Sequence, residues 1–575
     1  MSNFFLDNLD LKSALDGLEL SRVVALKENG FVDAGTFAWA PRDYADAIDN
    51  YRRTLEIVGE IAGEFVAPRA DDVDKAGSTL ADGEVCYAPG LSEALERLTQ
   101  ADLMGITLPR RFGGLNFPVT IAAMIIEIIS RADASLMNIF GLQDIAETIN
   151  KFASEEIKQT YLPRFASGEV TGSMALTEPE AGSDLQNIQL KARQDADGRW
   201  YLNGVKRFIT NGCGQVSLVL ARSEEGTTDA RGLSLFLYER DEHMRIRRLE
   251  EKLGIHGSPT CELQFVDAPA LLVGDRRRGL TTYVMSLMNG ARLAIAAQAQ
   301  GISEAAFRAA HKYAGERVQF GVPIREITAV STILADMKVA LDASRAILYE
   351  TSVIVDLKEG LESRLETRAA DLPGEEVKQL RVEAKKYARY AGLFTPLAKA
   401  VCTETANRVA YDSLQVHGGT GYMRDFAVER HLRDARITNI YEGTTQLQVV
   451  AARGGILGGV LSEWFDDCES QDLSRTPELL SRVKRARSHF ERAVDRVQKL
   501  DDQRFRDHHA TRLMEMGTDL VCAYLLLRSA QGDPRRLLTA QYFVEHKAPL
   551  VETGSELIEN SRPESLDSLP LLAEY

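Results

Sequence analysis

The chain has few of the residues that build metal centres and disulfide frameworks. Its 575 residues include only six cysteines and nine histidines, with no CxxC spacing and no HExxH pair. Zinc sites and redox-active cysteine pairs depend on such spacings. We therefore expect no metal site, and the scattered cysteines suit a reducing compartment.

Long apolar runs and an excess of positive charge are also missing. The most apolar stretches, 119–129 and 520–527, are shorter than the roughly 20 residues that span a bilayer. The first residues, Met-Ser-Asn-Phe-Phe-Leu-Asp, lack the basic start and cleavage pattern of a signal peptide. A net charge of −16 argues against a general affinity for nucleic acid or anionic membranes. We expect a cytoplasmic protein with no membrane span and no nucleic-acid partner.

Apolar residues, by contrast, are abundant enough for several cores. They make up 45% of the chain, and its length exceeds what one compact core holds. The changes in sequence texture predict an α+β multidomain protein with five regions. These are an irregular or weakly helical lead-in at 1–44, a helical domain at 45–167, a β domain at 168–276, a helical bundle at 277–458 and an appended helical domain at 459–575.

Turn signals separate short β-rich runs in the third region. Asp197-Gly198, Asn203-Gly204 and Asn211-Gly212 each have the composition of a hairpin turn, which predicts a small antiparallel β domain. Helical periodicity then returns in long stretches, and two amphipathic helices precede a polar tail. The expected long helices cover 285–315, 331–358, 374–410, 477–500 and 512–529. The acidic stretch 359–376 between two of them is expected to form a surface excursion.

A carboxylate at Glu442 lies between two predicted helices. An apolar stripe at Val428, Leu432 and Ala435 predicts a helix that ends near Gly443. Thr445 and Gln448 have capping-box spacing, so a second helix is expected to start there. A carboxylate in such a break can face a cavity. A lone loop glutamate is nevertheless far more often a solvated charge, so the assignment depends on the rest of the chain.

Two turn-rich segments in the β region could present polar groups to a ligand. In 174–184, Pro179 and Gly182 let the backbone reverse, although an ordinary turn is as plausible from the pattern alone. In 206–212, Phe208 and Thr210 would share one strand face, where a ring and a hydroxyl could stack on and hydrogen-bond to a flat ligand. A core role for an isolated phenylalanine is more common.

Two segments follow long predicted helices. The glycine-rich 415–421 allows close backbone approach but lacks GxGxxG spacing, so by itself it is a helix C-cap and turn, with His417 a surface or capping residue. In 316–323, Arg317 could bind a pyrophosphate through two hydrogen bonds or form a structural salt bridge.

Taken in order, these segments resemble the acyl-CoA dehydrogenase family of flavoproteins. The likeness covers about residues 45–455 and rests on 174–184, 206–212, 253–260, 317–323, 415–421 and 441–446. It implies a helical N-terminal domain, an antiparallel β middle domain and a four-helix-bundle C-terminal domain, with FAD between the last two and across a subunit interface. The extension beyond 458 is similar to the long members, including the very-long-chain and 3-methylmercaptopropionyl-CoA dehydrogenases, and implies a homo-oligomer, a dimer in many such members.

The resemblance assigns roles by position. Glu442 matches the catalytic base; some relatives place the base instead next to an arginine, where this chain has Ala291 beside Arg292. The implied cofactor-binding residues are Met174, Leu176, Thr177, Ser183, Phe208, Thr210, Arg317, Phe320, Gln415, Gly418, Gly419, Thr444 and Gln446. The implied substrate-binding residues are Ser183, Asn289, Arg292, Tyr441 and Gly443, with the acyl pocket expected along 136–147 through Met137, Phe140 and Leu142. Gln143 and Asp144 could contact a polar acyl chain, although a solvated or capping role is more common.

The implied reaction removes an α-proton and a β-hydride from an acyl-CoA thioester, giving a trans-2-enoyl-CoA. A desolvated carboxylate of raised pKa suits the first step, and FAD would accept the hydride. The resemblance also implies an electron-transfer flavoprotein as the electron acceptor. An acyl-CoA oxidase, an FAD-binding homologue without turnover, and a scaffold that uses its C-terminal helices remain the alternatives. Thr328 and His256 depart from residues common in the family, which leaves the FAD and loop contacts there open.

Overall fold

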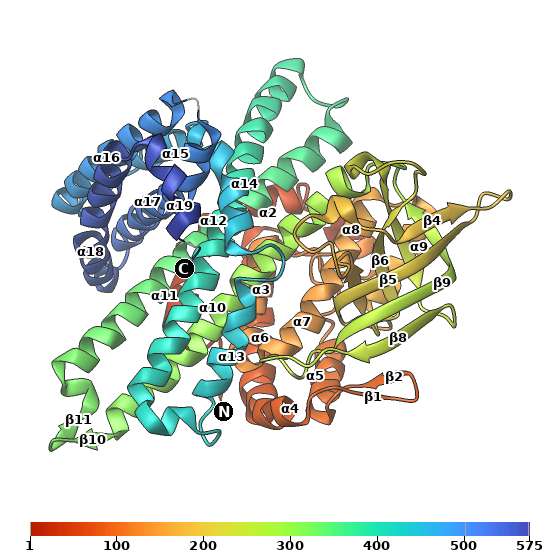
Figure 1. Ribbon diagram of the computed structural model, residues 1–575, viewed down its shortest axis with the longest axis horizontal. Coiled ribbons are helices and arrows are strands. Elements are labelled where there is room, and N and C mark those ends of the chain that lie inside the picture. Colours follow the sequence, from red (N-terminus) through yellow and green to blue (C-terminus); the bar gives the residue numbers. More distant parts are fainter. Residues whose placement is uncertain (1, 501, 573, 575) are drawn as a thin grey trace.

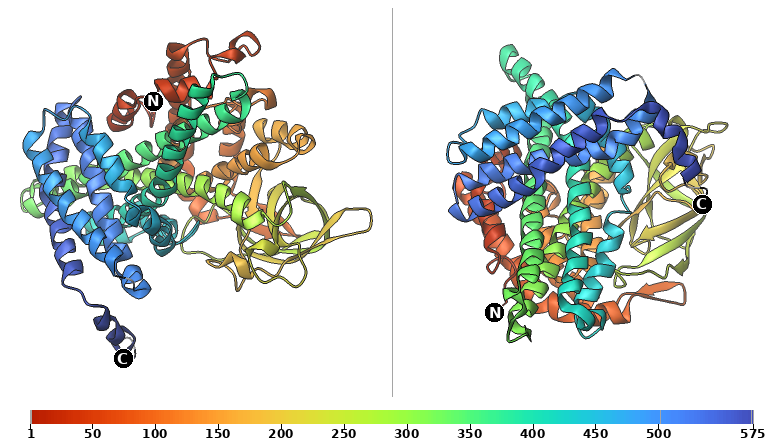
Figure 2. Two further views of the ribbon diagram at one scale, coloured as in Figure 1. Left: turned by 90° about the horizontal axis from the view of Figure 1, so that it is seen from above. Right: turned by 60° about the vertical axis from the view of Figure 1, so that its left-hand side comes forward.

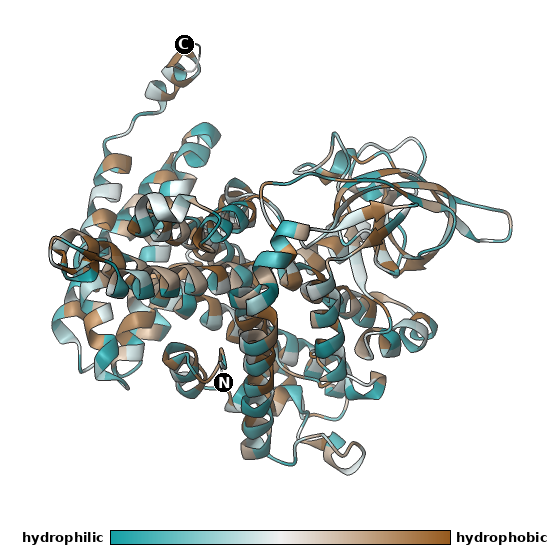
Figure 3. Ribbon diagram, turned by 90° about the horizontal axis from the view of Figure 1, so that it is seen from below, coloured by the Kyte–Doolittle hydropathy of each residue, from teal (hydrophilic) through white to brown (hydrophobic). Residues whose placement is uncertain are grey.

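The computed structural model describes residues 2–500, 502–572 and 574. A bundle of long helices occupies the centre, with the β domain on one side and the C-terminal helices on the other, an arrangement that both Figure 1 and Figure 2 show. Most helices carry hydrophilic and hydrophobic residues together in Figure 3, as amphipathic helices around shared cores do.

The lead-in is more regular than the sequence indicates. It contains α1 (Leu9–Gly17) and α2 (Ser21–Lys27), followed by a short 3-10 turn at Val32–Gly35. Asn8 caps α1 by accepting from the amide of Leu11 at 3.0 Å. The helices bury an apolar face against the bundle, where α2 packs on α11. Of the two expected characters, irregular or weakly helical, this segment has the helical one, because tertiary burial stabilises helices that are short and weak on their own.

Seven helices and a small hairpin form the next region. The helices are α3 (Tyr44–Glu60), α4 (Ala70–Ala76), α5 (Pro89–Gln100), α6 (Val119–Ala132), α7 (Ala134–Gly141), α8 (Ile145–Phe152) and α9 (Glu155–Ala166), and the hairpin strands are β1 (Thr79–Ala81) and β2 (Glu84–Cys86). α6 is buried on most of its surface and packs against α10. This contact joins the region to the central bundle in one core.

The β domain is a sheet that closes on itself. Its strands are β3 (Gly172–Ala175), β4 (Lys191–Gln194), β5 (Trp200–Thr210), β6 (Val216–Arg222), β7 (Leu233–Glu239), β8 (Met244–Leu249) and β9 (Thr260–Val273). The order β6-β4-β5-β9-β7 returns to β6, with β3 beside β6 and β8 beside β9. Most pairs are antiparallel as expected, but β6 runs parallel to both β3 and β4. A β-bulge in β5 between Lys206 and Ile209 accompanies a left-handed backbone at Phe208, with φ of 60°.

Three long helices run through the bundle. They are α10 (Met285–Glu316), α11 (Thr328–Arg368) and α12 (Gly374–His417), and the shorter α13 (Val428–Thr438) and α14 (Thr445–Leu457) complete it. The acidic stretch 359–376 is a surface excursion, as expected, but a largely helical one. It continues α11 and begins α12, so that only a short turn at its centre is non-helical and the two helices form a long hairpin at the top of Figure 1.

The C-terminal region has more helix than the sequence predicts. After α15 (Val460–Glu469), α16 (Pro477–Lys499) and α17 (Gln503–Ala530), α18 (Pro534–Glu559) covers much of what was expected to be a polar tail, and a short α19 (Leu569–Leu572) follows. Asp533 caps α18, and Pro534 at its first turn favours helix initiation. None of the described helices is long and apolar enough to cross a membrane.

Candidate active site

Glu442 lies in a strained turn between α13 and α14. Its φ is 52° and that of Gly443 is 88°, so two consecutive residues adopt the left-handed conformation, which costs energy for a non-glycine residue. α13 ends at Thr438, earlier than expected. Thr444, not Thr445, caps α14, since its hydroxyl accepts from the amide of Leu447 at 3.3 Å. The cap forms one residue earlier because the left-handed residues reverse the chain before Thr444.

Two buried donors hold the carbonyl of Gly443. Lys399 on α12 donates through Nζ at 2.7 Å, and Gln448 on α14 donates through Nε2 at 2.8 Å. Lys399 and Gln448 are both fully buried. The turn is therefore fixed by contacts from two helices, which makes the unusual backbone of Glu442 stable.

The environment raises the pKa of Glu442 to about 7. Burial causes the rise, and the positive charges of Lys399 and Arg292 partly oppose it. The same burial lowers the pKa of Lys399 to about 8 and lowers that of Arg292. A carboxylate with a pKa near neutrality can take up a proton and release it again, as a general base must.

Tyr441 connects this turn to the N-terminal helices and the β domain. Its hydroxyl contacts Gln298 on α10 and, at 3.2 Å, Asn138 on α7. Asn138 in turn donates to Ser258 in the loop before β9 at 3.5 Å. These hydrogen bonds of Tyr441 help to hold the neighbouring Glu442 in place. The Tyr441 hydroxyl is thus already bonded to protein groups.

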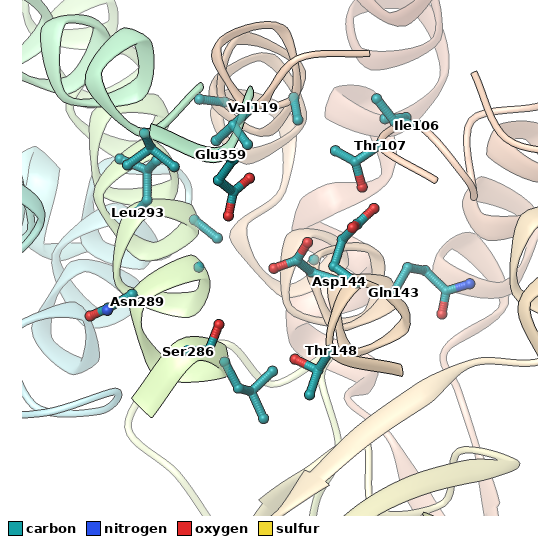
Figure 4. A pocket seen from close by; sticks show the side chains of 18 of the residues that line it. Ile106, Thr107, Val119, Gln143, Asp144, Thr148, Ser286, Asn289, Leu293 and Glu359 are labelled. Atoms are coloured by element: carbon teal, nitrogen blue, oxygen red, sulfur yellow. The ribbon is translucent and has the colours of Figure 1, made fainter. Parts of the chain in front are cut away.

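A cavity of about 260 Å³ lies between α6, α8, α10 and α11. Apolar residues such as Val119, Phe140 and Leu293 form part of its wall (Figure 4). Asn289 and Thr395 line it as well, one turn from Arg292 on α10 and from Lys399 on α12 respectively. The cavity thus lies next to the groups that surround Glu442.

Carboxylates line the same cavity from separate elements. Asp144 and Glu359 both point into it in Figure 4, and Glu147 lies beside Asp144. Burial and then the negative charges of Glu147 and Glu359 raise the pKa of Asp144 to about 7. Gln143, by contrast, bonds the carbonyls of Phe165 and Val170, so it holds the backbone instead of facing a ligand. Of the expected pocket residues, Phe140 lines the cavity, whereas Met137 and Leu142 are not part of its wall.

The residues expected at the flavin ring lie together at one edge of the β domain. The amide of Arg207 donates to the carbonyl of Thr177 at 2.9 Å, which places the Thr177 turn beside Phe208. The bulge turns Phe208 outward and leaves 51% of its side chain exposed. Thr210 and Met174 are partly buried, Leu176 is buried and Ser183 is exposed.

The remaining expected cofactor residues form a second group at the far end of the bundle. Arg317 and Phe320 belong to a small hairpin of β10 (Val318–Gln319) and β11 (Val322–Pro323) that follows α10. Phe320 is 95% exposed, and Gln415, Gly418 and Gly419 are exposed at the end of α12. The β10–β11 hairpin and the end of α12 both lie at the lower left of Figure 1. Arg317 is 25 residues beyond Arg292 along α10, which is roughly 37 Å at helical rise.

His417 lies in the last turn of α12, so of the two expected positions, surface or helix end, only the surface one is wrong. It is buried and stacks on Tyr313, with ring centroids 4.3 Å apart. Thr444 and Gln446 lie near Glu442 instead of near the far group, with Thr444 occupied as a helix cap and Gln446 exposed.

Descriptions of four protein domains match almost the whole chain. They are "Acyl-CoA dehydrogenase, N-terminal domain" at 49–169, "Acyl-CoA dehydrogenase, middle domain" at 173–268, "Acyl-CoA dehydrogenase, C-terminal domain" at 278–384 and 361–454, and "Acyl-CoA dehydrogenase C terminal" at 462–566. The chain belongs to the acyl-CoA dehydrogenase family. The resemblance seen in the sequence is thereby confirmed, and the fold class with it.

Individual relatives agree with this membership. The 3-methylmercaptopropionyl-CoA dehydrogenase of Ruegeria pomeroyi is 32% identical over 431 residues, covering 70% of this chain and 69% of the relative. An acyl-CoA dehydrogenase of Bacillus subtilis is 35% identical over 413 residues, covering 70% of this chain and 97% of the relative. The solved acyl-CoA dehydrogenase of Bacillus anthracis, described as complexed with FAD, has a TM-score of 0.75 at 23% identity and covers 91% of this chain and 90% of that one. Its likeness shows that the fold extends through the C-terminal helices.

Membership of this family of oxidoreductases confirms FAD as the expected cofactor, and the residues of this chain fit it. Phe208 is held outward by the β-bulge beside two hydroxyl-bearing residues, Thr177 and Thr210. A Cβ atom added at Gly418 or Gly419 would meet nothing within 4 Å, so a ligand can approach that backbone closely. Residues that suit each end of a dinucleotide are therefore present, but the two groups of residues lie on opposite sides of the molecule.

Sequence reasoning missed Lys399 and gave Gln448 a different role, as the partner of Thr445 in a capping box. A lysine in a long helical pattern is usually solvated, so its type gave no signal. The neighbours of Lys399 could have indicated that it is buried, because Ala398 and Ala400 flank it inside an apolar stretch that must be buried. The charged groups Glu147 and Glu359 of the cavity carried no comparable signal, since they come from segments more than 200 residues apart.

Proposed function

We propose that the protein catalyses FAD-dependent α,β-dehydrogenation of an acyl-CoA thioester to a trans-2-enoyl-CoA, with Glu442 as the base. The observation that carries this proposal is the position of Glu442 in a fixed left-handed turn, next to a cavity and to the cations Lys399 and Arg292. FAD, when bound, supplies the acceptor for the hydride that leaves the β-carbon.

The residues of the chain would supply binding and proton transfer. The cavity would receive the acyl group, with Asn289 and Arg292 on its CoA side; the two are joined by a hydrogen bond of 3.0 Å. Arg292 Nε is buried and has no hydrogen-bond partner among the residues that the structure describes, so it can bond a ligand oxygen. The α-proton would pass to a carboxylate oxygen of Glu442, and exclusion of water would strengthen each of these electrostatic contacts.

The decisive test is Glu442→Gln. The amide keeps the shape but cannot accept the proton, so α-proton exchange with bound acyl-CoA should fall by about 10²–10⁴-fold. Exchange into deuterated buffer, followed by mass spectrometry, measures this step directly. In the wild type the exchange rate should fall below about pH 7, where Glu442 becomes protonated.

Glu404→Gln is the matched control, since it makes the same change five residues beyond Lys399 on α12. Its carboxylate bonds Asn439 and Thr445 outside the cavity, and exchange should stay within about twofold of the wild-type rate. Exchange at the wild-type rate in Glu442→Gln would reject the base assignment.

We further propose electron-transfer flavoprotein as the acceptor and a dimer in the cytoplasm as the working form, with a role in fatty-acid β-oxidation. An acyl-CoA oxidase is the alternative. Anaerobic bleaching of the flavin by acyl-CoA, compared with the hydrogen peroxide formed in air, separates the two. A series from acetyl-CoA to palmitoyl-CoA defines the acyl group. If no member bleaches the flavin, the protein is an FAD-binding homologue without this turnover.

A further inference from the structure

Lys399 is a buried lysine whose ammonium group forms no salt bridge within the described part of the chain. Two of the described lysines are completely buried, Lys206 and Lys399. Lys206 forms an ion pair with Glu178 at 2.8 Å. Among the described residues, Lys399 makes no such pair and donates instead to the carbonyl of Gly443. A buried charge without a counter-ion is costly, so its retention needs a reason.

The surroundings of Glu442 supply that reason. Arg292 on α10 and Lys399 on α12 are the two cations that favour its charged form, and Lys399 has the larger effect. Tyr441 on the turn also faces Glu442, and Glu404 on α12 faces Lys399. The Glu404 carboxylate is bonded to Asn439 and Thr445, which leaves the ammonium of Lys399 available to Glu442.

We infer that Lys399 is a positioning residue for the proposed reaction, which fixes the Glu442 turn through the carbonyl of Gly443 and keeps Glu442 ionised by its charge. The inference rests on the proposed function for its catalytic consequence. Gln448 can perform only the first of these two tasks, because it donates to the same carbonyl but carries no charge. Comparing variants of Lys399 and Gln448 therefore distinguishes the effect of the charge from the effect of the hydrogen bond to Gly443.

The test compares Lys399→Met, Lys399→Arg and Gln448→Met as FAD-loaded proteins. Each is assayed for α-proton exchange from pH 5 to 9 with one acyl-CoA that the wild type exchanges. In Lys399→Met the pH at which exchange is half-maximal should rise by at least about one unit, with a roughly tenfold loss at pH 6.5 and less at pH 9. Lys399→Arg should keep the wild-type midpoint because it keeps the charge.

Gln448→Met decides between a charge effect and a simple loss of support. If Lys399 only stabilises the turn through its hydrogen bond, both methionine variants lower exchange equally at all pH values. The pH of half-maximal exchange then stays unchanged, and the inference is wrong. A shifted midpoint in Lys399→Met alone supports it.

A second readout needs no substrate. The difference in melting temperature between the parent and its Glu442→Gln variant follows the ionisation of Glu442 as pH changes. This titration should move to higher pH in the Lys399→Met background and stay in place in the Lys399→Arg background. A titration that does not move overturns the inference even where exchange cannot be measured. If the wild type exchanges no thioester, the proposed function fails instead, and the melting experiment still judges Lys399.

Discussion

Single ionisable residues give this site its chemical character. Glu442, Lys399 and Asp144 each have a pKa near neutrality because each lies where water is scarce. They differ in their partners. Glu442 faces two cations that favour its charged form, whereas Asp144 faces two further carboxylates, each of which affects its pKa more than its one cationic neighbour, Lys27. A buried carboxyl group can therefore act as a base at Glu442, whereas at Asp144 its ionisation destabilises the fold.

Asp144→Asn should stabilise the protein at neutral and alkaline pH. The folded-state pKa of Asp144 is about 7, above its unfolded value, so the folded state holds the proton more tightly. This contribution to stability is complete below about pH 4 and is lost as pH rises to about 7. Asparagine does not titrate, so the advantage of the variant should grow over that window and then level off. Melting curves from pH 4 to 9 should show a gain of about 1–3 kcal/mol at pH 8.

Asp356→Asn is the matched control for that experiment. Asp356 is also buried with a pKa raised to about 6, but it accepts bonds from the amides of Val119 and Thr120 and from the Thr120 hydroxyl. An asparagine cannot reproduce all of these, so this variant should be less stable than the wild type at every pH. A stability gain at Asp144 that does not depend on pH would mean that packing, and not charge, limits the cavity.

At the scale of elements, the C-terminal helices share one core with the bundle. Phe394 and Leu397 on α12 are completely buried in the same cluster as Trp464 and Phe465 on α15 and residues of α17 and α18. A scaffold role would predict that deletion after Gly458 leaves flavin binding intact. The shared core argues against that outcome, because the deletion would expose a large contiguous apolar surface on α11 and α12.

A chain that stops after Gly458 should therefore be insoluble or melt at least about 10 °C below the full chain. A chain that stops after Ser568 is the control, because it loses α19, whose leucines are largely exposed, and keeps the buried Leu566. It should melt within about 2 °C of the full chain. Circular dichroism melts and flavin content measure both. A stable, FAD-loaded 1–458 fragment would show that the bundle folds without its extension.

The helices and turns that local patterning predicted correctly are those with strong periodicity or clear turn residues. The spans of α10 and α16 follow from apolar spacing, and Asp197-Gly198 lies in the turn between β4 and β5 as expected. The turn expected at Asn203-Gly204 is wrong, because this pair lies inside β5 at an irregularity of its pairing with β9. α18 was missed because its apolar face is interrupted by charged residues and Pro549. Glu442 could be singled out only through the resemblance, since its strained backbone is maintained by Lys399 and Gln448 from other helices. No local pattern encodes that support.

At the scale of the whole molecule, the two groups of expected FAD residues raise a question of assembly. Phe208 and Thr210 lie on the β domain, whereas Arg317 and Phe320 lie on the exposed hairpin at the opposite end of α10. The dimer proposed above, if closed by twofold symmetry, would bring the far end of one copy to the β domain of the other, and would do so twice. Each active site would then combine Glu442 from one copy with Arg317 from its partner.

This arrangement predicts complementation between two damaged chains. Glu442→Gln lacks the base, and Arg317→Ala should retain FAD poorly because it lacks a cation for the diphosphate. In a heterodimer of the two, one site combines an intact Glu442 with an intact Arg317, so tagged and purified heterodimers should recover about half of the wild-type turnover. A heterodimer of Glu442→Gln with Lys399→Met is the control. Both lesions affect the base of their own chain, so neither site is restored. If the first heterodimer is no more active than the two parent homodimers, Arg317 serves the cofactor of its own chain or none, and the two-copy site is rejected.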